Sequence, residues 1–207
     1  CENGVKVNIK WLNSEEIEKD SKILKGLDGI IVPGGFGSRG TEGMIMTSKY
    51  ARENNVPYFG ICYGMQIALI DIARNKLGYK GANSTEIDPE TNYPIIDLLE
   101  NQKNIKNVGG TLRLGNYGCT IHKDTLVYSL YGEEKIKEML DNEQIAICYE
   151  DAPNGSALNV EALMSKDGKI LGKMGHSERV TEDTFKNIDG IELEDIFTAG
   201  VEFFKKD

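Results

Sequence analysis

The residues best suited to chemistry lie around Cys62, in the segment Phe59-Gly60-Ile61-Cys62-Tyr63-Gly64. An apolar run precedes the cysteine and a stretch with helical spacing follows it, as in a nucleophile on a sharp turn between a strand and a helix. Glycines on either side leave room where other side chains would clash with the sheet and the helix. The turn exposes the sulfur at the carboxyl edge of the sheet, and the N-terminus of the helix favours its thiolate. This pattern predicts a nucleophilic cysteine.

A nucleophilic cysteine needs a general base, and the chain has only two histidines, His122 and His176. His176 directly follows a predicted strand and stands two residues before Glu178, whose carboxylate can orient the imidazole and stabilise its charged form. His122 follows a short apolar segment and is interpreted as a surface or strand-end residue. The sequence therefore predicts a triad of Cys62, His176 and Glu178.

A second glycine turn, Pro33-Gly34-Gly35-Phe36-Gly37, follows the apolar run Gly29–Val32. Backbone N–H groups at such a turn can point at a developing oxyanion. Residues 35–40 also match the G-x-G-x-x-G pattern, but the acidic residue expected about 20 positions later in a dinucleotide site is absent. The turn is therefore interpreted as part of the catalytic site.

Composition limits the class of protein further. The chain has 207 residues, of which 40% are hydrophobic and 28% charged, and it carries a formal net charge of -9. The acidic balance disfavours nucleic acid and anionic membranes as partners, and no apolar run approaches the roughly 20 residues of a membrane span. The four cysteines match neither a zinc site nor a disulfide framework, so we expect no metal and a cytoplasmic location.

The predicted elements alternate between strand and helix, which favours an α/β fold with a mostly parallel central sheet flanked by helices. Ser14 is the expected cap of a first helix, and Ser165–Gly168 is expected to join two strands as a hairpin. Strands are expected at 5–12, 29–32, 56–62, 111–114, 120–122, 145–149, 160–164 and 169–174, and helices at 41–54, 64–74, 133–140 and 191–205.

Several of these segments resemble the glutaminase domain of CTP synthase, a class I glutamine amidotransferase. The likeness covers about residues 5–132 and rests on Pro33–Gly37 with Arg39–Gly43, on Phe59–Gln66, and on Asn83-Ser84-Thr85-Glu86 with Gly109–Gly115. The arginine-containing glycine turn and the Asn-Ser-Thr-Glu segment are specific to that resemblance.

The resemblance implies a flavodoxin-like fold in a single domain, residues 1–207, that is a fragment of a larger synthetase or a partner to one. It implies that Cys62 attacks the carboxamide of L-glutamine and that the triad of Cys62, His176 and Glu178 releases ammonia. The backbone N–H groups of Gly35 and Tyr63 would form the oxyanion hole. Glutamine would be held by Gly34, Gly35, Gln66 and Glu86, with Glu86 suited to the α-ammonium group. The domain itself would need no cofactor, because ATP and Mg would serve a synthetase domain that converts UTP to CTP.

The chain departs from that family in three places. Residues 137–144 lack an arginine-rich stretch, the triad motif is His-Ser-Glu instead of His-Pro-Glu, and a strand-helix unit that the family has before Val5 is missing. Residues from about 143 to 207 look more like the C-terminal end of formylglycinamidine ribonucleotide synthase, a purine-pathway amidotransferase. That glutaminase is one alternative. A flavodoxin-like cysteine peptidase or deglycase, and an amidotransferase-like domain with impaired catalysis, are two others.

Overall fold

The computed structural model describes residues 4–97, 144–149, 156–176, 178 and 196–205. The chain forms two compact units, one of residues 13–174 and one that joins residues 1–12 to 175–207. The larger unit contains the sheet and the predicted nucleophile, and the smaller unit contains His176 and Glu178. That the whole chain is one functional domain stays a prediction.

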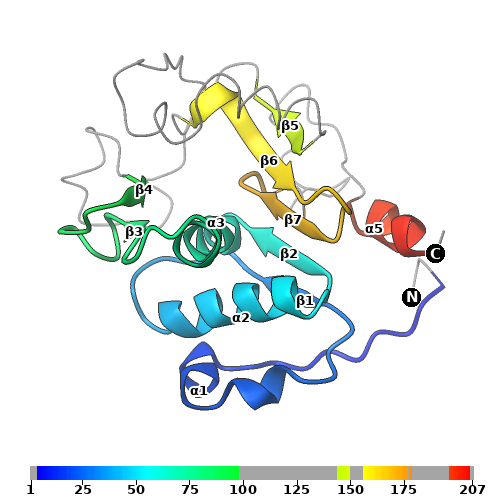
Figure 1. The fold of residues 1–207 in the computed structure, drawn as a ribbon. Coiled ribbons are helices and arrows are strands. Elements are labelled where there is room, and N and C mark those ends of the chain that lie inside the picture. The colour runs from blue at the N-terminus through cyan, green and yellow to red at the C-terminus, as the bar shows by residue number, and fades with distance from the viewer. Residues whose placement is uncertain (1–3, 98–143, 150–155, 177, 179–195, 206–207) are drawn as a thin grey trace, which may run out of the picture. The chain divides into compact units, whose positions relative to one another are not determined.

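A five-stranded sheet with the order β1-β2-β7-β6-β5 forms the centre of the larger unit (Figure 1). Its strands are β1 (Ile30–Val32), β2 (Tyr58–Ile61), β5 (Ile145–Cys148), β6 (Val160–Met164) and β7 (Ile170–Lys173). The pairs β1–β2 and β2–β7 are parallel, whereas β7–β6 and β6–β5 are antiparallel. The predicted hairpin between β6 and β7 is confirmed, with the Gly168 N–H donating to the Ser165 carbonyl at 2.9 Å.

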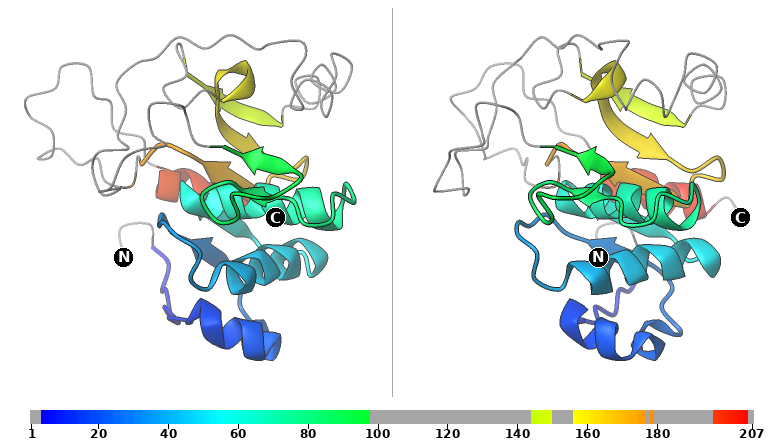
Figure 2. Two further views of the ribbon diagram at one scale, coloured as in Figure 1. Left: turned by 90° about the vertical axis from the view of Figure 1, so that its left-hand side faces the viewer. Right: turned by 60° about the vertical axis from the view of Figure 1, so that its left-hand side comes forward.

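Helices lie against the parallel part of this sheet, as Figure 2 shows for α2 (Thr41–Glu53) and α3 (Tyr63–Asn75). Helix α3 packs on β1, β2 and β7, and α2 packs on α3. Helix α1 (Ser14–Lys19) packs on α2 and is followed by the short 3₁₀ helix η1 (Ser21–Leu24). The predicted α/β fold, with a central sheet flanked by helices, is confirmed in this unit.

The start of α1 differs by one residue from the prediction that Ser14 is its cap. Asn13 is the N-cap, and its side-chain oxygen accepts the Glu15 N–H at 3.0 Å. Ser14 is instead the first residue of the helix, and its backbone and side chain lie where a Cβ on Gly40 or Gly43 would stand. Asparagine and serine both cap helices well. Here Ser14 does not serve as the cap, because it packs against the start of α2.

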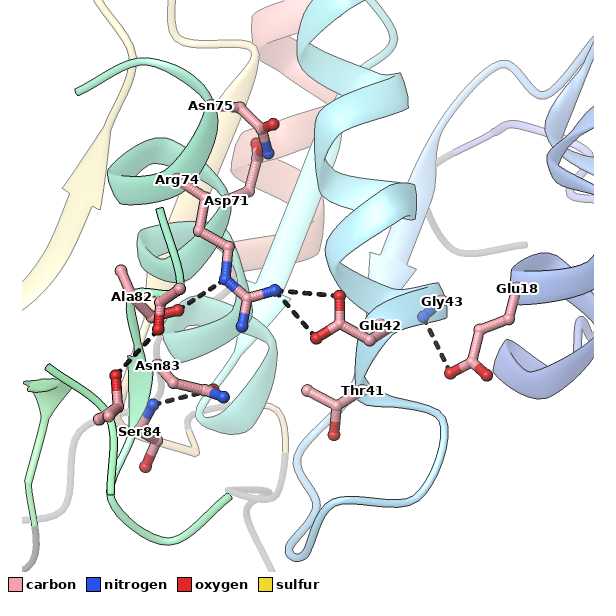
Figure 3. A network of polar contacts seen from close by, with 12 residues as sticks. Glu18, Thr41, Glu42, Gly43, Asp71, Arg74, Asn75, Ala82, Asn83 and Ser84 are labelled. Carbon is pink, nitrogen blue, oxygen red and sulfur yellow. Dashed lines mark hydrogen bonds and ion pairs between the residues drawn. The ribbon is translucent and has the colours of Figure 1, made fainter. Parts of the chain in front are cut away.

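Buried polar contacts fasten α2 to α3, in addition to the apolar core. Asp71 is fully buried on α3, and its carboxylate accepts hydrogen bonds from Ser48 and Arg52 on α2 and from Asn75 on α3. Figure 3 shows the neighbouring contacts of Arg74, which donates to Glu42 on α2 at 2.9 Å and to the Ala82 carbonyl at 2.6 Å. The orientation of α3, and hence of the residue that precedes it, is fixed from several sides.

A small parallel pair that the sequence did not predict follows α3. It consists of β3 (Asn83–Ser84) and β4 (Pro94–Ile96), in a region where the sequence predicts neither a strand nor a helix. Asn83 and Ser84 are buried, so the pair is anchored although it is short. Its position places Glu86, just beyond β3, next to the glycine turn.

The smaller unit corrects one prediction. Residues 5–12 do not form a strand, and the side chains of Val7, Ile9 and Trp11 are exposed, Trp11 by 90%. Alternation alone cannot make a strand, because the backbone must also pair with a neighbour. The helix expected at the C-terminus is present as α5 (Ile196–Phe204).

The elements expected at 111–114, 120–122 and 133–140, and His122 with them, lie outside the described residues. Within the described ranges, no helix has both the length and the apolar character required to cross a bilayer.

Tyr58 gives the stability of the larger unit a pH dependence. It is buried on β2 and its hydroxyl donates to the Gly64 carbonyl at 2.8 Å. Burial, and secondly the Asp71 carboxylate, raise the pKa of Tyr58 well above its ordinary value of about 10. The unfolded chain therefore loses this proton near pH 10 while the folded chain keeps it, so stability falls as the pH rises above about 10.

We expect urea unfolding to show this loss between about pH 9 and about pH 11, with Tyr58 contributing up to about 1.4 kcal/mol per pH unit above pH 10. Tyr58→Phe should lower stability near neutral pH by about 1 kcal/mol, because one hydrogen bond is lost, and should flatten the alkaline slope. Tyr63 and Tyr149, whose pKa values are also raised, should contribute to the slope that remains. An unchanged slope in the phenylalanine variant would refute the assignment to Tyr58.

Candidate active site

Cys62 occupies the turn between β2 and α3 that the sequence predicts. Its backbone has φ 52° and ψ -101°, an uncommon conformation for a residue with a side chain, and it serves as the N-cap of α3. The Cys62 N–H donates to the Lys173 carbonyl of β7 at 2.7 Å, and its carbonyl accepts from the N–H groups of Met65 and Gln66. The nucleophile is held between the neighbouring strand and the first turn of the helix.

The two glycines that flank this turn are required by close approach. A Cβ on Gly60 would lie 2.6 Å from the backbone of Gly64, and a Cβ on Gly64 would lie 2.1 Å from the Val32 carbonyl oxygen. These distances are far below contact, so strand and helix can meet in this way only without those side chains. The prediction that Gly60 and Gly64 leave room where other side chains would clash is confirmed.

The glycine turn of residues 33–37 lies beside the start of α3. The hydroxyl of Tyr63 donates to the Gly37 carbonyl at 2.5 Å, and the Gly37 N–H donates to Oε1 of Glu86 at 3.0 Å. A Cβ on Gly35 would be 3.6 Å from Cδ1 of the Tyr63 ring, which is ordinary van der Waals contact. The structure therefore brings together Gly35, Tyr63 and Glu86, three residues that the resemblance to the CTP synthase glutaminase domain assigns to one site.

The proposed donors suit an oxyanion. Tyr63 is the first residue of α3, so its N–H has no acceptor within the helix. The helix N-terminus adds a partial positive charge beside Cys62, which favours the thiolate and a developing negative charge. Gln66 lies one turn along the same helix, with its N–H bonded to the Cys62 carbonyl. The roles of these residues toward glutamine stay predictions.

His176 and Glu178 form the expected pair within the smaller unit. Nδ1 of His176 lies 2.7 Å from Oε1 of Glu178, and both side chains are partly buried. A carboxylate on Nδ1 fixes the ring and leaves Nε2 as the nitrogen suited to exchange protons with a thiol. The contact between the two side chains agrees with the predicted orientation of the base.

Sequence reasoning missed a buried ion pair beside the nucleophile. Lys173, whose carbonyl holds the Cys62 N–H, has its Nζ 2.8 Å from Oε1 of Glu161 on β6. The two residues are 3% and 4% exposed. Each of the two apolar strands of the hairpin contains a single charged residue, an acid on β6 and a base on β7. Two opposite charges on paired apolar strands are the signal that could have revealed the pair.

Tyr149 also lies near Cys62, at the end of β5. Burial chiefly, then the negative charges of Glu161 and of the Cys62 thiolate, raise the pKa of Tyr149 to about 12. The phenol is therefore neutral around physiological pH and remains a hydrogen-bond donor. The sequence gave no indication that Tyr149 lies near Cys62. The two residues are far apart in the chain, and only the folded sheet brings β5 toward Cys62.

The fold and the site define a class of protein. A central sheet flanked by helices, a cysteine on a strained strand-to-helix turn, a glycine turn beside it and a His–Glu pair are the parts of a Cys-His-Glu amidotransferase domain. The model of the class I glutamine amidotransferase family matches residues 1–186, and the chain belongs to this family.

The relatives are more specific. The chain is 57% identical over 138 residues to CTP synthase of Clostridium acetobutylicum, which is 66% of this chain and 26% of the relative. It is 54% identical over 181 residues to CTP synthase of Pyrococcus furiosus, which is 87% of this chain and 32% of the relative. The chain thus spans about a quarter to a third of the length of these relatives.

A solved structure agrees with these relatives. The glutaminase domain of Trypanosoma brucei CTPS, with bound acivicin, superimposes with a TM-score of 0.60 at 28% sequence identity. The superposition covers 86% of this chain and 75% of that one. The predicted resemblance to CTP synthase glutaminase domains is confirmed.

Proposed function

We propose that this chain hydrolyses L-glutamine through a thioester on Cys62 and supplies the ammonia to a synthetase domain that converts UTP to CTP. The observation that carries the proposal is the strained Cys62 turn, placed beside a glycine turn that Glu86 and Tyr63 hold. The similarity to CTP synthases supports the choice of acceptor.

The chemistry has two halves. The Cys62 thiolate attacks the carboxamide carbon, the oxygen takes up negative charge toward the N–H groups of Gly35 and Tyr63, and protonation by His176 lets ammonia leave. Water, deprotonated by His176, then attacks the thioester, and glutamate leaves with regeneration of the thiol. Gly34, Gln66 and Glu86 would hold the substrate, with the Glu86 carboxylate near its α-ammonium group.

The proposed base, His176, follows in the chain the strand next to the nucleophile. β7 ends at Lys173, and His176 follows three residues later in the chain. Because β2 and β7 are parallel neighbours, both run toward the same edge of the sheet, the edge at which open α/β sheets act on ligands. The order of the chain thus supports the proposal that His176 carries the proton, and the 2.7 Å contact of its Nδ1 with Glu178 supports Glu178 as its orienting residue.

Substitution of the pair tests that assignment. We expect His176→Ala to lower kcat/KM for glutamine by about 10²- to 10⁴-fold, the usual contribution of a positioned acid or base. Glu178→Gln should have a smaller effect in the same direction, because the ring loses its orienting carboxylate but stays in place. Ammonia release from glutamine measures both. Full hydrolysis in the alanine variant would remove His176 from the mechanism.

The acceptor is tested with a partner. The chain is mixed with the amidoligase domain of a CTP synthase, UTP, ATP and Mg, and glutamine-dependent CTP formation is measured, with added ammonia as the control for the synthetase. CTP formed from glutamine supports the proposal. If glutamine is turned over but no CTP forms, and the ammonia instead supports a purine-pathway synthetase, the chain would be a glutaminase of the formylglycinamidine ribonucleotide synthase type.

Two other outcomes would replace the proposed reaction. Activity on peptides or aldehydes without glutamine turnover would indicate a peptidase or deglycase. Failure to turn over glutamine, with or without a synthetase, would indicate an impaired domain. The proposed reaction itself uses no cofactor, and a reducing cytoplasmic setting suits Cys62 and Cys148, neither of which is in a disulfide.

A further inference from the structure

The side chain of Tyr63 makes contacts that the proposed reaction leaves unused. Tyr63 is 3% exposed, and its hydroxyl lies 2.5 Å from the Gly37 carbonyl and 3.1 Å from Oγ1 of Thr41. A carbonyl oxygen can only accept, so Tyr63 donates its proton to Gly37 and receives the Thr41 hydroxyl as donor. The phenol is thus satisfied on both sides.

These contacts span the glycine turn. The ring packs beside Gly35 and the hydroxyl holds Gly37, while Glu86 holds the Gly37 N–H. The turn has few side chains of its own with which to fix its N–H groups. Its geometry therefore depends on groups outside it, chiefly on residue 63 and residue 86.

Tyr63 is also the residue that directly follows the nucleophile. Its backbone is part of the Cys62 turn, and its side chain holds the glycine turn in place. A single residue thus joins the two segments whose N–H groups are expected to receive the oxyanion. A displacement of one turn relative to the other would stretch the bond between the Tyr63 hydroxyl and Gly37.

The hydroxyl keeps its proton over the working range. Burial chiefly raises the pKa of Tyr63 above its ordinary value, and the Glu86 carboxylate raises it further, against a lowering by the Thr41 hydrogen bond. The donor to Gly37 therefore persists at neutral and mildly alkaline pH.

We propose that the Tyr63 hydroxyl is a positioning group, which sets the glycine turn of residues 33–37 in register with the Cys62 turn so that both oxyanion donors meet one oxygen. This role rests on the proposed glutamine hydrolysis and adds to it a function for the Tyr63 side chain. The group acts on the transition state through Gly35 and touches no substrate itself.

Tyr63→Phe tests the role, because it deletes the hydroxyl and keeps the ring. We expect kcat for glutamine hydrolysis to fall about 10-fold or more, since misplacing a donor loses part of the roughly 10²- to 10³-fold that a whole donor supplies. KM should change by less than about 2-fold, because the oxyanion forms only after binding.

Alkylation of Cys62 by iodoacetamide supplies the readout that separates positioning from general damage. This reaction needs the thiolate and no oxyanion donor, so we expect its rate in Tyr63→Phe to match that of the wild type. The modified Cys62 peptide is followed by mass spectrometry, which distinguishes it from Cys148. A parallel fall in alkylation and turnover would mean that the Cys62 turn itself is disturbed, and would overturn the proposal.

Two further variants complete the test. Ser48→Ala deletes another buried hydroxyl, bonded to Asp71 at 3.2 Å, and should leave kcat and alkylation unchanged. Thr41→Val should lower kcat in the same direction as Tyr63→Phe, and Thr41→Ser should restore it. Unchanged kcat in Tyr63→Phe, with an active wild type, overturns the role of Tyr63 alone. An inactive wild-type chain overturns the proposed function, and this role with it.

Discussion

Replacing Cys62 with alanine should abolish glutamine hydrolysis, with a fall in kcat of at least about 10⁴-fold to the background rate. The neighbouring side chains cannot replace the thiol in forming the acyl intermediate, because Gly60 and Gly64 have none and the Tyr63 hydroxyl is bonded to the Gly37 carbonyl. Cys62→Ser should be nearly as inactive, since a serine hydroxyl is a far weaker nucleophile at neutral pH than a thiolate. Ammonia release from glutamine, measured with a coupled assay, gives the result.

Cys148 supplies the matched control for this substitution. It is the other cysteine outside any disulfide in the described part of the chain, and it is exposed on β5. Cys148→Ala should retain full hydrolysis and lose one alkylation site, whereas Cys62→Ala loses both the activity and its own site. Normal turnover in Cys62→Ala would end the proposed mechanism, whatever the fate of the acceptor assignment.

The largest effect on stability is expected at Lys173. Lys173→Met should lower the free energy of unfolding by about 3–5 kcal/mol, because it leaves the Glu161 carboxylate in the interior without its ammonium partner. The double variant Glu161→Leu with Lys173→Met should recover most of this loss, since a well-packed apolar pair often replaces a buried ion pair without penalty. Urea unfolding of the three variants and the wild type measures both effects.

A surface pair serves as the comparison for this experiment. Arg39 lies 2.6 Å from Glu15, but its side chain is 83% exposed, so water screens the attraction. Arg39→Met should cause no measurable change in stability. If Lys173→Met were equally harmless, the buried pair would not be an important contact between β6 and β7.

The nucleophile turn was predictable because the residues that it requires lie close together in the sequence. Gly60 and Gly64 stand at fixed positions around Cys62, and the structure shows that a Cβ at either one would strike the backbone. The apolar strand before the turn and the helical spacing after it lie within a few residues. Local spacing therefore determined this part of the fold and of the site.

Predictions that depended on distant partners were less successful. The alternating residues 5–12 have strand-like side chains, yet they form no strand, because pairing is a property of a neighbour and not of the segment. Conversely, β3 is the polar pair Asn83–Ser84 and β4 begins with Pro94, yet the two strands pair because the fold brings them together. Alternation and composition carry no information about which backbone lies alongside.

The contacts that hold the glycine turn in place also join residues far apart in the sequence, so they could not be predicted from it. The Tyr63 hydroxyl reaches back 26 positions to Gly37, and the Gly37 N–H reaches Glu86 49 positions away. Nothing near residue 63 distinguishes a tyrosine that fixes a turn from one that fills a core. The backbone role of Tyr63 came from its place after the nucleophile, whereas its side-chain role required the coordinates.

The bond from the Cys62 N–H to the Lys173 carbonyl has a consequence for the synthesis of the chain. The nucleophile strand β2 leaves the ribosome roughly a hundred residues before β7, its partner on one side, and such long-range pairing forms slowly. β6 and β7 are joined by a tight hairpin, so they can form locally and then add to β2 as a unit. A nascent chain therefore carries Cys62 without its β7 neighbour, and the reactive turn is completed only after β7 has been made and has joined β2.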